Sequence, residues 1–259
     1  AFAKYGFNKS HAIAYSTISY ICMWLKHYYP LEWKTAALTG ATKEDFKEFY
    51  QEWFDVIDKP DVNTSKMHYV INEERTKTLM PFSFVNGVGD KAVDSIVSKQ
   101  PFKSFADFYD RVDGRRVNKK CILNLILSGV FDSFFKGKDF YGYRRKLIAE
   151  FFELKNKKKK FTSKESLEVE EYLSEIKKWD KSNFLEKEID LLNITTFDYF
   201  KFYKEQMTKG AKKILGGEAI RPEAVEKKKN RDVVIVGGVL KRKTVFPIKN
   251  GKSKGEDMM

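Results

Sequence analysis

The chain has 259 residues, of which 42% are apolar and 15% aromatic, enough to bury at least one substantial core and to form two or three modules. Its formal net charge of +13 favours a polyanionic partner, namely DNA, RNA or an anionic membrane surface. Two cysteines without Cys-x-x-Cys spacing and three histidines support neither a disulfide framework nor a zinc site, so we expect a reducing cytoplasm.

The amino-terminal third is predicted to be helical. A long helix is expected over residues 10–27. Its apolar part, residues 12–25, is too short for a clean membrane span, so we expect it to be buried within the protein. Pro30 then begins a second helix. Residues 43–57 form a third, whose aromatic face we interpret as core rather than as a base-stacking platform; it contains Phe46, Phe49, Tyr50, Trp53 and Phe54.

A glycine-rich turn follows two short extended segments, residues 67–71 and 78–82. Residues 82–96 begin as an apolar run that breaks at Gly87 and Gly89 and resumes with helical spacing, a pattern typical of a helix-hairpin-helix. Glycines at these positions permit positive φ and expose N–H groups where a phosphate can approach a helix N-terminus. Together with Asn86 and Lys91, the two glycines predict binding to the phosphate backbone of duplex DNA, independent of base sequence. The alternative is an ordinary glycine-capped corner.

A second hairpin is predicted after a helix over residues 104–112. Four cations, Arg115, Arg116, Lys119 and Lys120, surround Asn118, which is a candidate N-cap for a helix that ends at residue 129. Positive side chains gathered at one helix start can bind phosphate better than scattered ones. The alternative here is a solvated charged turn.

The rest of the chain is predicted to be a connector followed by strands. Residues 134–179 contain a lysine-rich run at 155–160, and because like charges repel, we expect a helical or partly disordered connector. Helical periodicity returns over residues 185–202, and residues 208–230 form a linker. Residues 231–240 and 244–246 are expected to be strands, too few for an independent sheet domain.

The motif Tyr-Gly-Phe-Asn-Lys-Ser-His-Ala at residues 5–12 resembles the fingers-domain motif of C-family bacterial replicative DNA polymerases, the alpha subunit of DNA polymerase III, in its main branch. The resemblance continues in register through the fingers, at Ala14, Tyr15, Ile18, Ser19, Tyr20, Trp24, Leu25, Lys26, Tyr29, Pro30, Ala36, Ala37 and Leu38. Pro60, Asp61, Val62, Asn63 and Ser65 resemble the end of the fingers. The helix-hairpin-helix domain of the family is matched by Gly87, Val88, Gly89, Ala92, Pro101, Phe102, Phe105, Phe108, Val117, Asn118, Lys119, Leu123, Ile126, Gly129, Phe131, Asp132 and Ser133. Asn86 stands where the family more often has Lys.

This resemblance implies a mainly α fold with a truncated β start at its carboxyl end. Residues 1–72 would be the end of the polymerase fingers, 73–135 a tandem helix-hairpin-helix DNA-binding domain, 136–230 a charged helical connector, and 231–259 the incomplete beginning of an OB-fold. The chain begins at Ala1 without an initiator methionine or signal peptide, so we expect a piece of a longer protein, cytoplasmic in a bacterial or phage-infected cell.

The resemblance also places Asn8, Lys9 and His11 where they would face the phosphates of the incoming nucleotide. From the residues alone, the alternative is helix capping by Asn8 or Ser10, with Lys9 in solvent. The implied partners are primer-template duplex DNA, incoming dNTP and the remaining polymerase segments (palm, fingers and thumb), with no membrane. The family's clamp-binding peptide has no convincing counterpart before Glu188, which speaks against binding of the sliding clamp.

Nucleotidyl transfer needs two metal ions held by converging carboxylates, and the sequence shows no such set. We therefore predict no catalytic residue, no metal site and no bound cofactor in this fragment, which alone would be inactive. The catalytic aspartates and Mg²⁺ would lie in the palm of the parent polymerase.

Two other classes of protein stay open. A helix-hairpin-helix repair enzyme, a glycosylase or nuclease, would need a catalytic Lys and Asp or metal carboxylates close after the hairpin, which Lys91 and Asp94 supply poorly. A basic RNA-binding protein fits the charge but does not explain residues 5–11.

Overall fold

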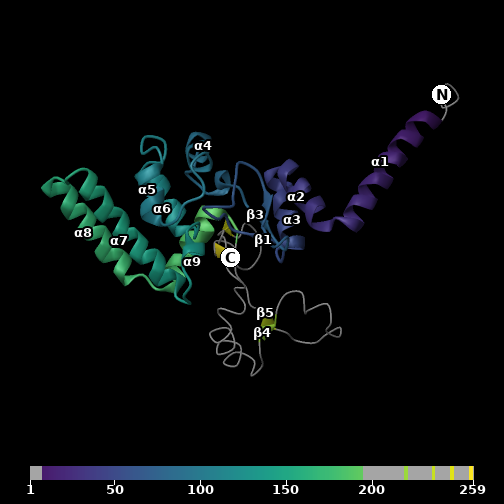
Figure 1. Cartoon of the computed structure of the whole chain (residues 1–259). Helices are drawn as coiled ribbons and strands as arrows, with labels where there is room; N and C mark the ends of the chain where they lie inside the picture. Colours follow the sequence, from purple (N-terminus) through teal and green to yellow (C-terminus); the bar gives the residue numbers. More distant parts are fainter. Residues whose placement is uncertain (1–7, 195–218, 221–234, 237–245, 248–256, 259) are drawn as a thin grey trace. The chain divides into compact units, whose positions relative to one another are not determined.

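The computed structural model describes residues 8–194 and the short segments 219–220, 235–236, 246–247 and 257–258. The chain divides into two compact units, residues 1–196 and residues 197–259. Helices make up most of the first unit, beside one small sheet (Figure 1). The predicted mainly α fold is confirmed.

Three helices open the first unit: α1 (Lys9–Tyr28), α2 (Pro30–Gly40) and α3 (Lys43–Trp53). Each has a local reason to start where it does. The Asn8 side chain caps α1, Pro30 occupies the first turn of α2, and Thr42 with Asp45 forms a capping box at α3.

The prediction that the first helix is buried is wrong. α1 forms as expected, yet none of its residues is buried, and Ile13 and Tyr20 are 55% and 70% exposed. The reason is tertiary: α1 packs mainly against α2, so most of its apolar circumference is left uncovered. No helix in the described part of the chain is long and apolar enough to cross a membrane.

A small sheet follows, with strands β1 (Ile57–Asp58), β2 (Val70–Ile71) and β3 (Thr78–Leu79). β3 is central, parallel to β1 and antiparallel to β2. Strands thus form in both predicted extended segments, over 70–71 and 78–79, while Phe82 at the end of the second already begins η2. The predicted helix over residues 43–57 instead ends at residue 53, because Ile57 pairs with Thr78 in the sheet, and Phe54 is 62% exposed rather than in the core.

The helix-hairpin-helix region comprises η2 (Phe82–Phe84), α4 (Asp90–Val97), α5 (Phe105–Arg111), α6 (Lys119–Leu127) and η3 (Asp132–Phe134). Its interior is aromatic and aliphatic: Phe108, for example, lies edge-on to Phe102 and to Phe131, and all three rings are buried. Burying such rings stabilises the unit and fixes the angle between its helices.

Three longer helices complete the first unit: α7 (Phe140–Lys158), α8 (Ser163–Lys178) and α9 (Lys181–Leu192). The predicted connector is mainly helical as far as the structure describes it, to residue 194, and its charge does not keep these helices from packing. α7 packs against α5, α6 and α8, and α9 against α6 (Figure 1). The lysine-rich run occupies the last turn of α7 and the two residues after it, where cations suit the helix dipole, and leaves the apolar stripe of α7 free to pack.

A buried ionic cluster ties these helices to the helix-hairpin-helix region. Arg144 on α7 is 2% exposed; its Nε lies 3.0 Å from Asp132 Oδ1 and its Nη1 2.6 Å from Glu188 Oε2 on α9. Lys59 Nζ also contacts the Asp132 carboxylate. Burial lowers the pKa of the Arg144 guanidinium, but Glu188 and Asp132 outweigh burial and hold that pKa above its ordinary value.

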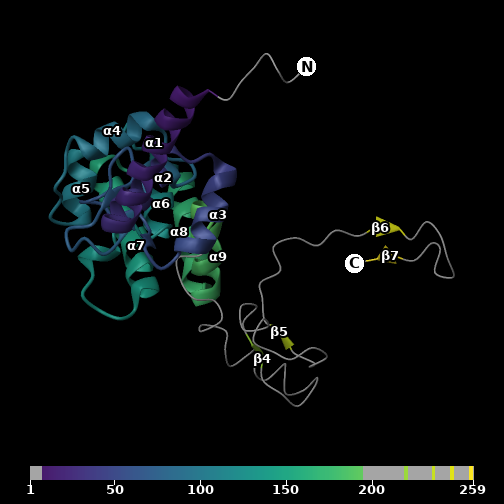
Figure 2. The same cartoon turned by 90° about the vertical axis from the view of Figure 1, so that its right-hand side faces the viewer.

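In the second unit, β4 (Ala219–Ile220) pairs with β5 (Ile235–Val236) in parallel, and β6 (Phe246–Pro247) pairs with β7 (Asp257–Met258) in antiparallel fashion (Figure 2). β5 and the start of β6 lie within the segments predicted as strands. The linker at 208–230 lies outside the described residues except for 219–220, and the helix predicted over 185–202 is described only to residue 194. The OB-fold and the domain boundaries stay predictions.

Cys121, in the first turn of α6, links stability to pH. Burial raises the pKa of its thiol to about 11, from an ordinary value of 9.0. The protonated thiol is therefore favoured in the folded state, and this stabilisation, complete below pH 9, should fall by about 2 to 3 kcal/mol as pH rises to 11. Urea unfolding from pH 8 to 11 should show a steeper loss for the parent than for Cys121→Ala; parallel curves would contradict it.

Candidate nucleic-acid interface

The first hairpin runs from η2 through Gly87 and Gly89 into α4. Gly87 has φ +85°, in the region that favours glycine. Gly89 is the N-cap of α4 with φ −90° and ψ 163°, an extended conformation. The expectation of positive φ is confirmed at Gly87 and wrong at Gly89, whose role is to open the helix. Val88, between them, is buried and anchors the turn.

Exposed N–H groups gather at the start of α4. The Gly89 carbonyl accepts from Ala92 and Val93. The N–H groups of Gly89, Asp90 and Lys91 come before these donors, where an α-helix has no carbonyl of its own to accept from them. All three residues are exposed, and a Cβ built on Gly89 would meet nothing within 4 Å. This helix end is open to an anion, with Lys91 as an added cation and Asp90 as a competing carboxylate.

Asn86 is held by protein rather than left free for a ligand. Its backbone N–H donates to Leu191 O at 2.9 Å and its Nδ2 to Asp190 O at 2.7 Å, both on α9. Its own carbonyl accepts from Asn124 Nδ2 of α6 at 2.7 Å. The contact of Asn86 with a phosphate stays a prediction. In the structure, Asn86 joins the hairpin to α6 and α9 by hydrogen bonds.

The second hairpin presents its cations unequally. Asn118 accepts from Cys121 N at 3.0 Å, so the predicted N-cap is confirmed. Arg116 Nε lies 3.4 Å from Asp113 Oδ2, and Lys119 Nζ lies 5.1 Å from the ring centroid of Phe152. Arg115 and Lys120 are exposed and have no ion-pair partner in the described part of the chain.

The two hairpins meet at Gly87. A Cβ built there would lie 2.7 Å from Asn124 Nδ2 and 3.8 Å from Lys120 Cε, both on α6. Gly87 and Lys120 also line one shallow pocket of about 290 Å³, which Lys187 and Asp190 of α9 complete. The structure thus brings together a glycine of the first hairpin and a cation of the second, as a shared phosphate site requires.

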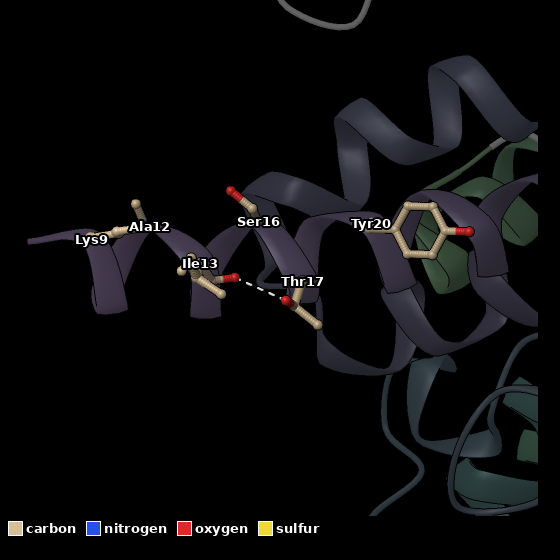
Figure 3. Close-up of a pocket in the computed structure, with 6 residues that line it drawn as sticks. All are labelled: Lys9, Ala12, Ile13, Ser16, Thr17 and Tyr20. Atoms are coloured by element: carbon tan, nitrogen blue, oxygen red, sulfur yellow. Dashed lines mark hydrogen bonds between the residues drawn. The ribbon is translucent and has the colours of Figure 1, made fainter.

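The predicted nucleotide-facing residues lie elsewhere, on α1. Asn8 Oδ1 accepts from His11 N at 3.1 Å, so Asn8 caps the helix. Lys9 lies on a side of α1 formed also by Ala12, Ile13, Ser16, Thr17 and Tyr20 (Figure 3). In the described residues, no hydrogen bond or ion pair joins Lys9 or His11 to the hairpins. Their contact with a nucleotide stays a prediction.

Sequence reasoning missed Asn124 and Lys187. Asn124 lies within a helix and Lys187 in a segment interpreted as connector, so neither carries a local signal of function. Among the described residues, no three His, Cys, Asp or Glu side chains gather as a metal site would require.

A family model described as a helix-hairpin-helix motif matches residues 56–140. Three relatives, each named DNA polymerase III subunit alpha, match about half of the chain. They are from Chlamydia trachomatis (41% identical, 53% of this chain), Pasteurella multocida (36%, 51%) and Deinococcus radiodurans (36%, 52%). The matched stretch covers 12%, 12% and 11% of the relatives' own length. Over about half its length, then, this chain is similar to proteins named DNA polymerase III subunit alpha, and it carries a helix-hairpin-helix region.

Proposed function

We propose that this chain is part of a replicative DNA polymerase and that its helix-hairpin-helix region grips duplex DNA by the phosphate backbone. The observation that carries the proposal is the meeting of the two hairpins, where Gly87 and Lys120 line one exposed pocket beside the open start of α4. The names of the relatives support a polymerase as the parent.

The chemistry of this surface favours backbone over base recognition. It offers backbone N–H groups and lysines, which bind phosphate oxygens and carry no base information. The net charge of +13 adds long-range attraction for a polyanion. Binding should therefore be independent of sequence and strongly dependent on salt.

The finer parts of the proposal rest on the resemblance of residues 5–12 to the fingers motif. Asn8, Lys9 and His11 would face the incoming dNTP, and palm, thumb and the rest of the fingers would cover the exposed side of α1. The palm of the parent would hold Mg²⁺ and the catalytic carboxylates, so the chain alone would not transfer nucleotides. We place the parent in the cytoplasm and expect no contact with the sliding clamp through this chain.

The test is fluorescence anisotropy of the full chain on primed duplex DNA, single-stranded DNA and duplex RNA across a salt series. Duplex DNA should bind best, with affinity falling steeply with salt. Gly89→Val should weaken binding about tenfold or more, because it blocks the approach of a phosphate to the N–H groups, while its Cβ would have no other atom of the protein within 4 Å. Gly40→Val, also built into open space, is the matched control.

Three results would overturn the proposal. Equal binding by the Gly89 and Gly40 variants would make the hairpin purely structural. A preference for duplex RNA would favour the RNA-binding class, and nicking or base excision by the parent chain would favour a repair enzyme.

A further inference from the structure

We propose that Lys187 on α9 is a further phosphate-binding residue of the DNA surface, and that it contacts the same phosphodiester as the Gly87 turn and Lys120. The inference rests on the proposed function and deepens it, because α9 lies outside residues 56–140, the part that the helix-hairpin-helix family model matches. Helix α9 is then part of the binding site and not only a connector.

The first step is that α9 is fixed against the hairpin. Its last turn accepts two hydrogen bonds from Asn86, at Asp190 O and Leu191 O. One residue from Lys187, the buried Glu188 is bound by Arg144. These contacts set the rotation of α9, so that Glu188 points inward and Lys187, 49% exposed, is presented at the pocket around Gly87.

The second step is the charge and chemistry of the pocket. None of the described residues that line it is aromatic, so it suits a phosphate rather than a stacked base. Two lysines, Lys120 and Lys187, face one carboxylate, Asp190. Lys187 Nζ lies 3.8 Å from Asp190 Oδ2, and Asp190 is 69% exposed. Such exposed pairs contribute little to stability, so a phosphate can replace Asp190 as the partner of the Lys187 ammonium group.

The third step is that substitutions at two neighbouring residues, Lys187 and Asp190, should change the affinity for duplex DNA in opposite directions. If a phosphate binds here, Lys187 attracts it and Asp190 repels it. Lys187→Gln should therefore weaken duplex binding, and Asp190→Asn should strengthen it. A purely structural role for α9 predicts for Asp190→Asn no more than the general effect of one unit of net charge on DNA binding.

The test measures the affinity of the full chain for a fluorescent 20-base-pair duplex across a potassium chloride series. Lys187→Gln should weaken binding about three- to tenfold at low salt and reduce the slope of log K against log salt by about 0.9, the loss of one phosphate contact. Asp190→Asn should tighten binding about two- to threefold. Lys181→Gln, the same charge change at an exposed position at the start of α9, controls for net charge and should leave the slope unchanged.

Two results would overturn the inference. One is equal slopes for the Lys187 and Lys181 variants; the other is no gain for Asp190→Asn. If Gly89→Val still loses binding in that case, the proposed function stands and only the role of Lys187 fails. If the parent chain shows no duplex binding, the proposed function fails and this inference fails with it.

Discussion

Replacing Arg144 with Met is expected to lower the free energy of unfolding by about 3 to 5 kcal/mol. The guanidinium is 2% exposed and bridges Asp132 and Glu188, which are themselves buried. Without it, Glu188 loses the cation bound to its carboxylate, and Leu127 O loses a donor at 3.0 Å. Buried charge that loses its compensation is costly, whereas the intact pair by itself adds little.

Urea unfolding followed by circular dichroism measures this effect, and Lys146→Met on the exposed side of the same helix is its matched control, expected within about 0.5 kcal/mol of the parent. The double variant Arg144→Met/Glu188→Leu should be more stable than Arg144→Met alone, because it removes a buried carboxylate together with its cation. A single variant within about 1 kcal/mol of the parent would show that the cluster is hydrated in solution.

Gly129→Ala is the second substitution with a large expected effect. Gly129 has φ +80°, which costs an L side chain about 1 to 2 kcal/mol. A Cβ there would overlap Arg144 Nη2 and lie 2.7 Å from both Asp132 Oδ2 and Lys59 Nζ. The methyl group would therefore push apart the buried ionic cluster, and we expect a total loss of about 2 to 4 kcal/mol.

Gly114→Ala is the control for this substitution, since a Cβ built on Gly114 meets nothing within 4 Å. Thermal unfolding of both variants beside the parent compares them directly. The Gly114 variant should melt within a few degrees of the parent and the Gly129 variant well below it. Equal melting temperatures would mean that the cluster moves aside without cost.

Much of the fold could be predicted from local sequence, because local chemistry decides where helices begin and end. Asn8 and Asn118 cap their helices as their positions suggest, and Gly129 follows α6 with the positive φ that a helix end favours. The two-hairpin arrangement also follows from residue order. These features depend on neighbours within about four residues, which a sequence displays directly.

The site could be predicted only in part. Gly87, Lys120 and Asn118 are found from motif and charge. The structure confirms the cap at Asn118 and shows in addition that Gly87 lies near Lys120. Lys187 could not be found in this way, because it is 100 residues from Gly87 in the numbering and is brought there by hydrogen bonds from Asn86 to α9.

The helical class, the caps, the hairpin turns and the basic charge of the chain can all be recognised from the amino-acid sequence, since each depends on composition or on short-range contacts. Which apolar faces are covered depends instead on long-range packing, which leaves α1 exposed and buries one face of α7. Long-range packing also buries Arg144 between Asp132 and Glu188, although nothing near Arg144 in the sequence distinguishes it from the other charged residues. Burial and ion pairing arise between segments that are distant in sequence, and a local pattern does not show which distant segment will contact a given residue.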